Sequence, residues 1–458
     1  MKIRMVLLES AAIAVVIFLS LTADVVRCQE ESAGEVFEMR EVSVFDIDSP
    51  IASMLQSGMS ARECGDNPNK NVTAYPEFKS EKPLYGTAMF DMSIINYGCG
   101  INYYFALDES GGTGTGYDRF YFDANHDMDL TNDGILSLMA NPPAELRIQN
   151  QSRLKEIAFD YLQFQIDYGS GEKSQPVKII PKFRQISENK SVRFIYPTAR
   201  KGKVRLGSKE FEAVLSQGSM ISGSYDRQIT YLFLGNNMES MPILSAWRFV
   251  DGKFYTFCAT ASGDKLTVKP YSGPYGLLEV GSAGENIKDG TIELGWLQSR
   301  DAIIDIAKCD KEDGKLKVPV GDYRPFKVAV RYDGIRMVLN IKIAAPEEPP
   351  TEPPVFGMQI RPDKPFVFNL TEKPEVIFNK PAANQRIMAG TELKVEAILF
   401  YPEINTLIGA LEDTTKKKGD NIKLPDGTEY ANFESIDPTV EIINSSVQVV
   451  AEGKMPFG

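Results

Sequence analysis

Short apolar runs separated by turn residues fill this chain from residue 81 to residue 340. Runs such as 102–107 and 203–206 are rich in Val, Leu, Phe or Tyr, and most runs are bounded by Gly, Asp, Asn or Pro. This pattern is typical of strands and predicts an all-β fold, with a β-sandwich or barrel over most of the chain. Residues 152–158 and 299–306 are exceptions, where we expect short helices.

A proline-rich segment, AAPEEPPTEPP, interrupts the pattern of strands after residue 343. Proline cannot donate to a sheet ladder and favours extended backbone, so residues 344–357 are predicted to form a semi-rigid linker. The strand-like runs that follow suit an immunoglobulin-like β-sandwich over residues 358–458, although the Cys–Trp–Cys core of antibody domains is absent. Residues 81–343 are expected to form the β-rich main region, either whole or as two subdomains.

The first residues have the pattern of an export signal. Lys2 and Arg4 precede an apolar run at 10–21, and Ala23 ends an imperfect cleavage motif. We therefore expect a signal peptide over residues 1–23, with export to the periplasm, the cell surface or the extracellular medium. The apolar run is shorter than the roughly 20 residues of a membrane span, so no transmembrane span is expected after cleavage.

Residues 24–80 have little periodicity and are predicted to form a partly ordered lead-in. Two alternatives stay open for this end of the chain, namely an uncleaved membrane anchor and lipidation at Cys28. Export permits disulfides, so Cys64 and Cys99 are candidates for a bridge, with buried free thiols as the alternative.

Oxygen-bearing side chains recur at every second position between residues 123 and 133. Calcium prefers six to eight oxygen ligands, and EF-hand loops supply them at this spacing. Four carboxylates within eleven residues also repel one another unless a cation neutralises them. The alternative is a solvated acidic turn without metal. The predicted calcium ligands are Asp123, Asn125, Asp127, Asp129, Thr131 and Asp133.

The loop departs from an EF-hand in three respects. Met128 stands at position six, where EF-hand loops need Gly, and Gly134 stands at position twelve, where they place a bidentate acid. The residues before Asp123 have the pattern of a strand and not of the entering helix. We therefore expect a strand–loop calcium site that Asp133 closes.

The chain has a single histidine, His126, at a non-ligand position of this loop. We expect its ring to point into solvent. Histidine-dependent hydrolases and histidine zinc sites would each have to use it, which argues against those classes of enzyme. The glycine-rich segment 111–116 fits neither a P-loop nor a dinucleotide motif, because no helix follows it, and predicts a flexible loop between strands.

A weak internal repeat accompanies the loop. Tyr117-Asp118-Arg119 precedes the strand before the acidic loop, and Tyr225-Asp226-Arg227 precedes another predicted strand. The residues after that second strand, Gly235-Asn236-Asn237, lack clustered carboxylates and are interpreted as a plain turn.

Several phrases, including Tyr117 to Asp123 and the acidic loop that follows, resemble a group of uncharacterised exported β-rich proteins of Planctomycetes-type bacteria. Members of that group carry an EF-hand- or dockerin-like D-x-N-x-D-x-D-L-T calcium loop. The resemblance covers scattered phrases over most of residues 75–458. It implies export and calcium binding, and it carries no assigned activity.

These observations predict a non-enzymatic, exported, calcium-binding protein with a structural or adhesive role in the cell envelope. Calcium is the expected cofactor, and an envelope component or glycan is the expected partner. The net charge of −12 repels phosphate backbones, so nucleic acid is excluded as a partner. The alternative is a carbohydrate-binding protein or a carboxylate-based carbohydrate-active protein.

Overall fold

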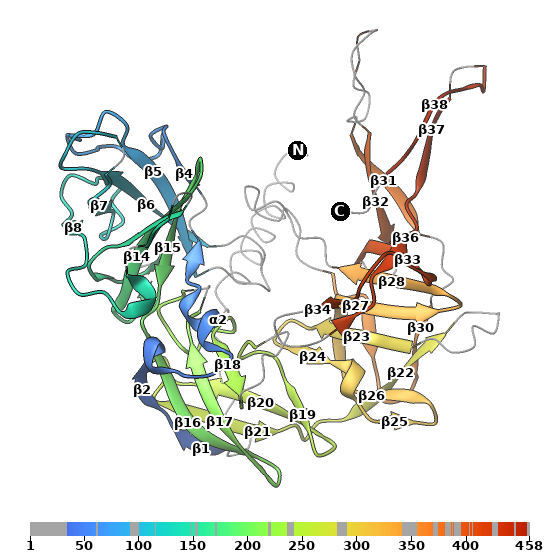
Figure 1. Ribbon diagram of the computed structural model, residues 1–458. Helices are drawn as coiled ribbons and strands as arrows, with labels where there is room; N and C mark the ends of the chain where they lie inside the picture. Colours follow the sequence, from blue (N-terminus) through green and yellow to red (C-terminus); the bar gives the residue numbers. More distant parts are fainter. Residues whose placement is uncertain are drawn as a thin grey trace, which may run out of the picture.

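The structure is a computed structural model, and Figure 1 shows its strands in chain order from blue to red. It describes residues 34–60, 63–91, 100–114, 116–147, 149–151, 154–169, 172–218, 221–235, 242–281, 291–340, 355–369, 374–380, 386, 388, 395–402, 404, 406–423, 429–443 and 446–455. The predicted signal peptide lies outside these residues. Within them the chain is almost entirely β, which confirms the predicted all-β class.

Two sheets in the first part of the chain share an aromatic core. Tyr103, Phe105 and Leu107 belong to this core, whereas Tyr104 and Ala106 join a smaller cluster on the opposite face, as the two-residue period of a strand requires. One sheet has the order β4 (Glu63–Gly65), β5 (Leu84–Phe90), β6 (Ile101–Asp108), β7 (Arg119–Phe122) and β8 (Ile135–Ser137). The other has the order β3 (Met59–Ser60), β15 (Asn189–Ile195), β14 (Val177–Ile186), β10 (Leu154–Ala158) and β9 (Gln149–Gln151), and β11 (Leu162–Phe164) also pairs with β14.

A second core lies between two further sheets. Leu215 on one sheet and Leu266 on the other are both fully buried in it. One sheet has the order β18 (Tyr231–Leu234), β17 (Lys209–Ser216), β16 (Thr198–Leu206) and β2 (Arg40–Ser43), and the other has the order β1 (Glu35–Glu38), β21 (Lys265–Pro270), β20 (Lys253–Ala259) and β19 (Arg248–Val250).

The last described strands build a third core, in which Val330, Leu339 and Ile360 are buried. A large sheet has the order β24 (Ile303–Asp305), β23 (Thr291–Gln298), β27 (Gly321–Tyr332), β28 (Ile335–Asn340), β33 (Thr406–Lys417), β32 (Glu396–Tyr401) and β31 (Glu375–Lys380), with β29 (Met358–Ile360) on β27 and β36 (Phe433–Ser435) on β33. A smaller sheet has the order β25 (Lys311–Glu312), β26 (Lys315–Pro319), β22 (Tyr275–Gly281) and β30 (Phe366–Asn369).

Four short elements and three strand pairs complete the described chain. The α-helix α2 places Leu55 in a cluster with Val214 and Phe233, so it covers the outer face of β17 and β18. The remaining elements are α2 (Ala52–Gln56), η1 (Val44–Asp46), η2 (Ala144–Leu146) and η3 (Ile306–Lys308), and the pairs β12 (Asp167–Gly169) with β13 (Glu172–Lys173), β34 (Ile422–Lys423) with β35 (Glu429–Tyr430), and β37 (Thr439–Ile443) with β38 (Val449–Lys454).

The predicted lead-in is built into the sheets wherever the structure describes it. β1 pairs with β21, β2 with β16, β3 with β15 and β4 with β5. The residues after 34 therefore contribute strands to four sheets whose other strands come from later in the chain.

Strand pairing also crosses the predicted linker. β33 pairs with β28, β29 with β27, and β30 runs parallel to β22. Six strands after residue 357, namely β29 to β33 and β36, thus share sheets with residues before 344. The structure differs there from the self-contained module that the sequence predicts, because β29, β30 and β33 each pair with a strand upstream.

The two predicted helices are wrong. Residues 154–158 are strand β10, which lies between β9 and β14, and residues 299–306 contain strand β24 and the start of η3. Pairing with a neighbouring strand satisfies the backbone polar groups of these segments, which are too short to form stable helices on their own.

Among the cysteines that the structure describes, Cys64 and Cys309 are free thiols. Burial raises the pKa of the Cys64 thiol to about 12. The Cys64–Cys99 bridge is therefore not formed, and Cys258 is disulfide-bonded instead. In the described part of the chain, no helix has both the length and the apolar character that crossing a lipid bilayer demands.

Candidate metal centre

The acidic loop connects β7 to β8 in the first sandwich. β7 buries Phe120 and Phe122 in the aromatic core, and this burial fixes the point at which the loop begins. Asp123 follows directly and is fully buried, while Asp127 and Asp129 lie further out. A carboxylate thus enters the edge of the sandwich, where burial of a charge is costly without a partner.

A series of side-chain-to-backbone hydrogen bonds shapes the loop. Asn125 Oδ1 accepts from the N–H of Asp127 at 3.0 Å, Asp127 Oδ1 from that of Asp129 at 2.9 Å, and Asp129 Oδ1 from that of Thr131 at 2.8 Å. Each is an Asx turn, in which a side-chain oxygen accepts a hydrogen bond from the N–H group two residues further along the chain. These Asx turns therefore explain the two-residue spacing of the polar side chains, as calcium ligation also would.

The two ends of the loop bring two carboxylates to the sandwich edge. Asp123 accepts from the N–H groups of Asp127 and Met128 at 3.0 and 3.1 Å. Asp133 Oδ1 accepts from the N–H of Ala124 at 3.2 Å, so it reaches back to the residue after Asp123. Asp133 Oδ2 is buried and has no hydrogen-bond partner. This buried oxygen is free to ligate a cation.

The electrostatics of the loop favour a cation. Burial raises the pKa of Asp133 to about 6, and the nearby charges of Asp123 and Asp127 add to the rise. Burial also raises the pKa of Asp123. Asp127 differs, because a hydrogen bond from the Asn132 amide lowers its pKa. A bound cation would relieve the unfavourable ionisation of Asp123 and Asp133 together.

The backbone at two non-ligand positions of the loop is left-handed. Met128 has φ 67° and His126 has φ 63°, a region that non-glycine residues rarely adopt. Met128 therefore makes the turn that EF-hand loops assign to glycine at position six. Its side chain packs against a small cluster that includes Tyr121 and Leu130, which offsets part of the strain.

The oxygen donors fit calcium in their chemistry, and Asp133 Oδ2 supplies an unsatisfied one. Their arrangement is not that of a converged cage, since no group of three or more His, Cys, Asp or Glu side chains among the described residues is placed to hold a metal ion. The carboxylates of Asp123, Asp127 and Asp129 instead accept hydrogen bonds from the loop.

The lead-in clamps the loop from outside. Thr73 donates its backbone N–H and its Oγ1 hydroxyl to the carbonyl of Met128 at 2.8 and 2.9 Å. The N–H of Leu130 donates to the carbonyl of Ala74 at 3.0 Å. The loop thus joins the lead-in to the sandwich, so a cation bound there would stabilise both.

His126 does not point into solvent, and that prediction is wrong. Its ring stacks on Tyr103 with centroids 4.5 Å apart, and its Nε2 lies 3.1 Å from the carbonyl oxygen of Asn102. The left-handed backbone at His126 turns the ring back over β6. The chain's single imidazole is therefore half-buried and engaged.

The glycine-rich loop surrounds an internal carboxylate. Glu109 is almost fully buried and accepts hydrogen bonds from the N–H groups of Gly114 and Gly116 and, at 3.0 Å, from the hydroxyl of Thr113. Backbone N–H groups that converge in this way form an anion-binding nest. The chain's own carboxylate fills the nest, and no residue pattern in the sequence indicated that pairing.

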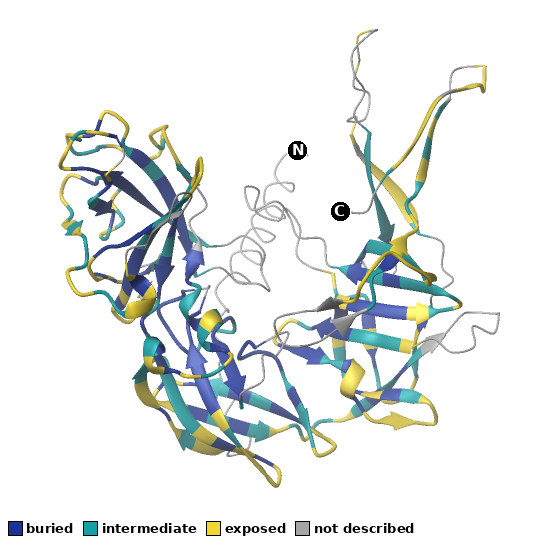
Figure 2. Cartoon of the chain, viewed as in Figure 1, coloured by how far each residue is buried: buried dark blue, intermediate teal, exposed yellow. Residues whose placement is uncertain are grey.

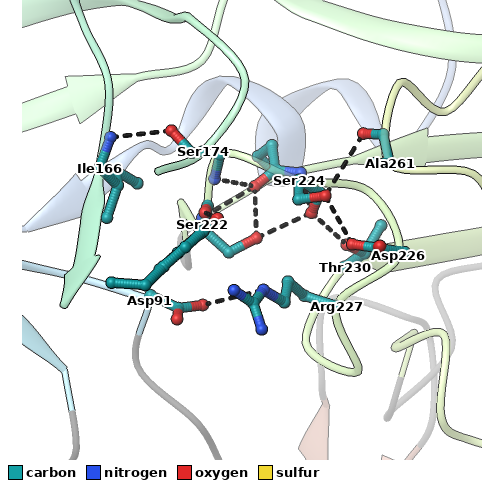
Figure 3. Close-up of polar contacts among 12 residues, drawn as sticks. Asp91, Ile166, Ser174, Ser222, Ser224, Asp226, Arg227, Thr230 and Ala261 are labelled. Carbon is teal, nitrogen blue, oxygen red and sulfur yellow. Dashed lines mark hydrogen bonds and ion pairs between the residues drawn. The ribbon is translucent and has the colours of Figure 1, made fainter. Parts of the chain in front are cut away.

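A buried polar network surrounds the repeated Tyr-Asp-Arg phrase, and Figure 3 shows it. Ser222 donates to Gln217 Oε1 at 2.9 Å, and Ser224 donates to Asp226 Oδ1 at 2.5 Å. Arg227 lies 3.8 Å from Asp91 and 4.2 Å from the ring centroid of Tyr168.

This network links separate sheets. Asp91 follows β5, its N–H donates to the carbonyl of Ile221 at 2.9 Å, and Tyr168 lies in β12. The second Tyr-Asp-Arg phrase thus serves a junction between the first and second cores. Of the turn predicted to follow it, Asn236 and Asn237 lie outside the described residues.

No family model, no curated protein and no solved structure matches this chain.

Proposed function

We propose that this chain is an exported calcium-binding protein with a structural or adhesive, non-enzymatic role in the cell envelope. The observation that carries the proposal is the loop of residues 123–133, in which Asp133 keeps a buried oxygen without a hydrogen-bond partner. Its pKa of about 6 reflects burial beside two other carboxylates. The signal-like first residues support a periplasmic, cell-surface or extracellular location.

The role proposed for calcium is structural. The loop lacks the bidentate acid at position twelve, so we expect a dissociation constant on the order of 0.1–1 mM, typical of extracellular modules. Such a site is filled where calcium is millimolar. Its occupancy would hold the lead-in at Thr73 and Ala74 against the sandwich.

Calorimetric titration of the full chain with calcium tests the proposal. We expect one site, and Asp127→Ala is expected to weaken it at least tenfold because a carboxylate ligand is lost. Asp363→Ala is the matched control, since Asp363 is an exposed aspartate far along the chain. Absence of binding in the wild-type chain would reduce the loop to an acidic turn.

Carbohydrate binding is the second candidate, and one observation favours it. Trp247 and Tyr271 are partly exposed neighbours with ring centroids 5.1 Å apart, and Tyr275 lies 5.3 Å from Tyr271. Aromatic rings that combine an apolar body with a polar tip are suited to stacking on sugars. A glycan array compared between the wild-type chain and Trp247→Ala separates this candidate from the first.

A further inference from the structure

β31 is the last strand of the large sheet. Residues Glu375–Lys380 pair with β32 on one side, and among the described residues no other strand pairs with β31. An edge strand presents unpaired backbone N–H and C=O groups, which can template pairing with another chain. β31 thus continues the large sheet to an open edge.

β31 carries charges only at its two ends, Glu375 and Lys380, and has a bulge between Phe378 and Lys380. Val376, Ile377 and Phe378 are consecutive and have exposed fractions of 51%, 39% and 56%. Because successive side chains point to opposite faces, both faces of this strand expose apolar groups. Soluble proteins usually place charges or proline on such an edge.

Side chains are less buried at this edge than in the rest of the large sheet. Leu339 on β28 is fully buried, whereas the side chains of β32 are only half-buried up to Phe400. Figure 2 shows this change from dark blue strands to the teal and yellow ribbon of β31 and β32. Among the described strands β31 pairs only with β32, so its exposed apolar side chains have no neighbouring strand on the open side.

The sequence of β31 is complementary to itself. Glu375 begins the strand and Lys380 ends it, with Val376, Ile377, Phe378 and the bulge residue Asn379 between. The bulge absorbs one residue, so two copies aligned antiparallel with Ile377 opposite Ile377 place each Glu375 opposite a Lys380. Opposite charges and apolar side chains directly across a strand pair stabilise it. Lys380 also contacts Glu396 of its own chain at 3.0 Å, an exposed pair that contributes little.

We propose that β31 is a homodimerisation edge, at which the β31 strands of two copies pair antiparallel and continue the large sheet from one molecule into the other. The occupant is a second copy because the charge pattern of Glu375 and Lys380 matches its own reverse. The pairing covers Val376, Ile377 and Phe378 and satisfies the edge backbone groups.

Sedimentation velocity of the full chain up to about 100 μM tests this proposal. We expect a dimer whose dissociation constant rises about tenfold with Glu375→Lys and also with Lys380→Glu, because each variant places like charges opposite each other twice. Glu145→Lys is the matched control, since Glu145 is exposed on η2, and it should leave the dimer unchanged.

Mixing the two variants gives a readout that misfolding does not produce. Glu375→Lys supplies two lysines and Lys380→Glu supplies two glutamates, so an equimolar mixture is expected to form a heterodimer with the wild-type dissociation constant. A monomeric wild-type chain, or a dimer that neither variant weakens, would overturn the proposal. Two weakened variants that show no recovery on mixing would overturn it as well.

Discussion

At the scale of single residues, position twelve of the acidic loop lacks the bidentate carboxylate that strengthens calcium binding in EF-hand loops. Gly134 stands there without a side chain, and a Cβ built on it meets nothing within 4 Å. Its φ is also outside the left-handed region. The position therefore accepts a side chain without steric cost, and the loop has room for one more carboxylate.

Gly134→Glu is expected to increase calcium affinity about tenfold, because a bidentate glutamate at this position is the strongest ligand that EF-hand loops add. Calorimetric titration against the wild-type chain measures the change. Gly453→Glu is the control, since its Cβ also meets nothing within 4 Å and it lies on β38. Unchanged or weaker affinity would show that Gly134 does not face the cation.

At the residue scale, sequence is informative where the cause of a conformation is local, whereas the calcium ligation stays a prediction. The two-residue spacing of Asn125, Asp127 and Asp129 produces Asx turns within the loop itself, so the sequence alone indicates a shaped loop. The orientation of His126 was predicted wrongly and the pairing of Glu109 was not predicted, because their partners are distant in the chain or are backbone groups. Tyr103 lies on β6, and the N–H groups of the glycine-rich segment carry no sequence signal.

At the scale of elements, the junction between the first two cores depends on Arg227. Its guanidinium is largely buried, lies 3.8 Å from Asp91 and stacks on Tyr168. Arg205 offers a contrast, since its pair with Glu35, at 3.9 Å, is mostly exposed. Buried ion pairs are costly to break from one side, whereas exposed pairs contribute little.

Arg227→Ala is expected to lower the free energy of unfolding by about 2–3 kcal/mol, because Asp91 and Tyr168 lose their partner. Arg227→Lys keeps the charge but loses the planar stacking, so a loss of about 1 kcal/mol in the free energy of unfolding is expected. Urea unfolding measures both. Arg205→Ala should cost less than about 0.5 kcal/mol, and a loss in Arg227→Ala no larger than in this control would contradict the assigned role.

At the element scale, a strand is easier to predict from sequence when the strand with which it pairs is near in the chain. The turn residues Asp313 and Gly314 have φ 49° and 79° and join β25 to β26, a hairpin whose signal is local in the sequence. β10 was predicted as a helix because its strand character comes from pairing with β14. The lead-in strands β1 and β2 were missed for the same reason, since β21 and β16 lie far downstream.

At the scale of the whole molecule, the metal loop and the large sheet belong to different cores. The loop borders the aromatic core of the first sandwich, and the second core separates it along the chain from the third. Units with their own cores can unfold separately. Trp247 packs against the third core and Trp296 lies in the cluster with Val214 and Phe233, so tryptophan fluorescence does not report on the aromatic core of the first sandwich.

Calcium is therefore expected to stabilise one part of the molecule selectively. With a dissociation constant of about 0.5 mM, 5 mM calcium adds about 1.4 kcal/mol to the unit that binds it, which raises its melting temperature by about 3–6 °C. Scanning calorimetry should show this shift in one transition, and tryptophan fluorescence should melt at the same temperature with calcium and with chelator. Asp127→Ala should abolish the calorimetric shift. An equal shift in both signals that survives in Asp127→Ala would show that calcium acts elsewhere than at the loop.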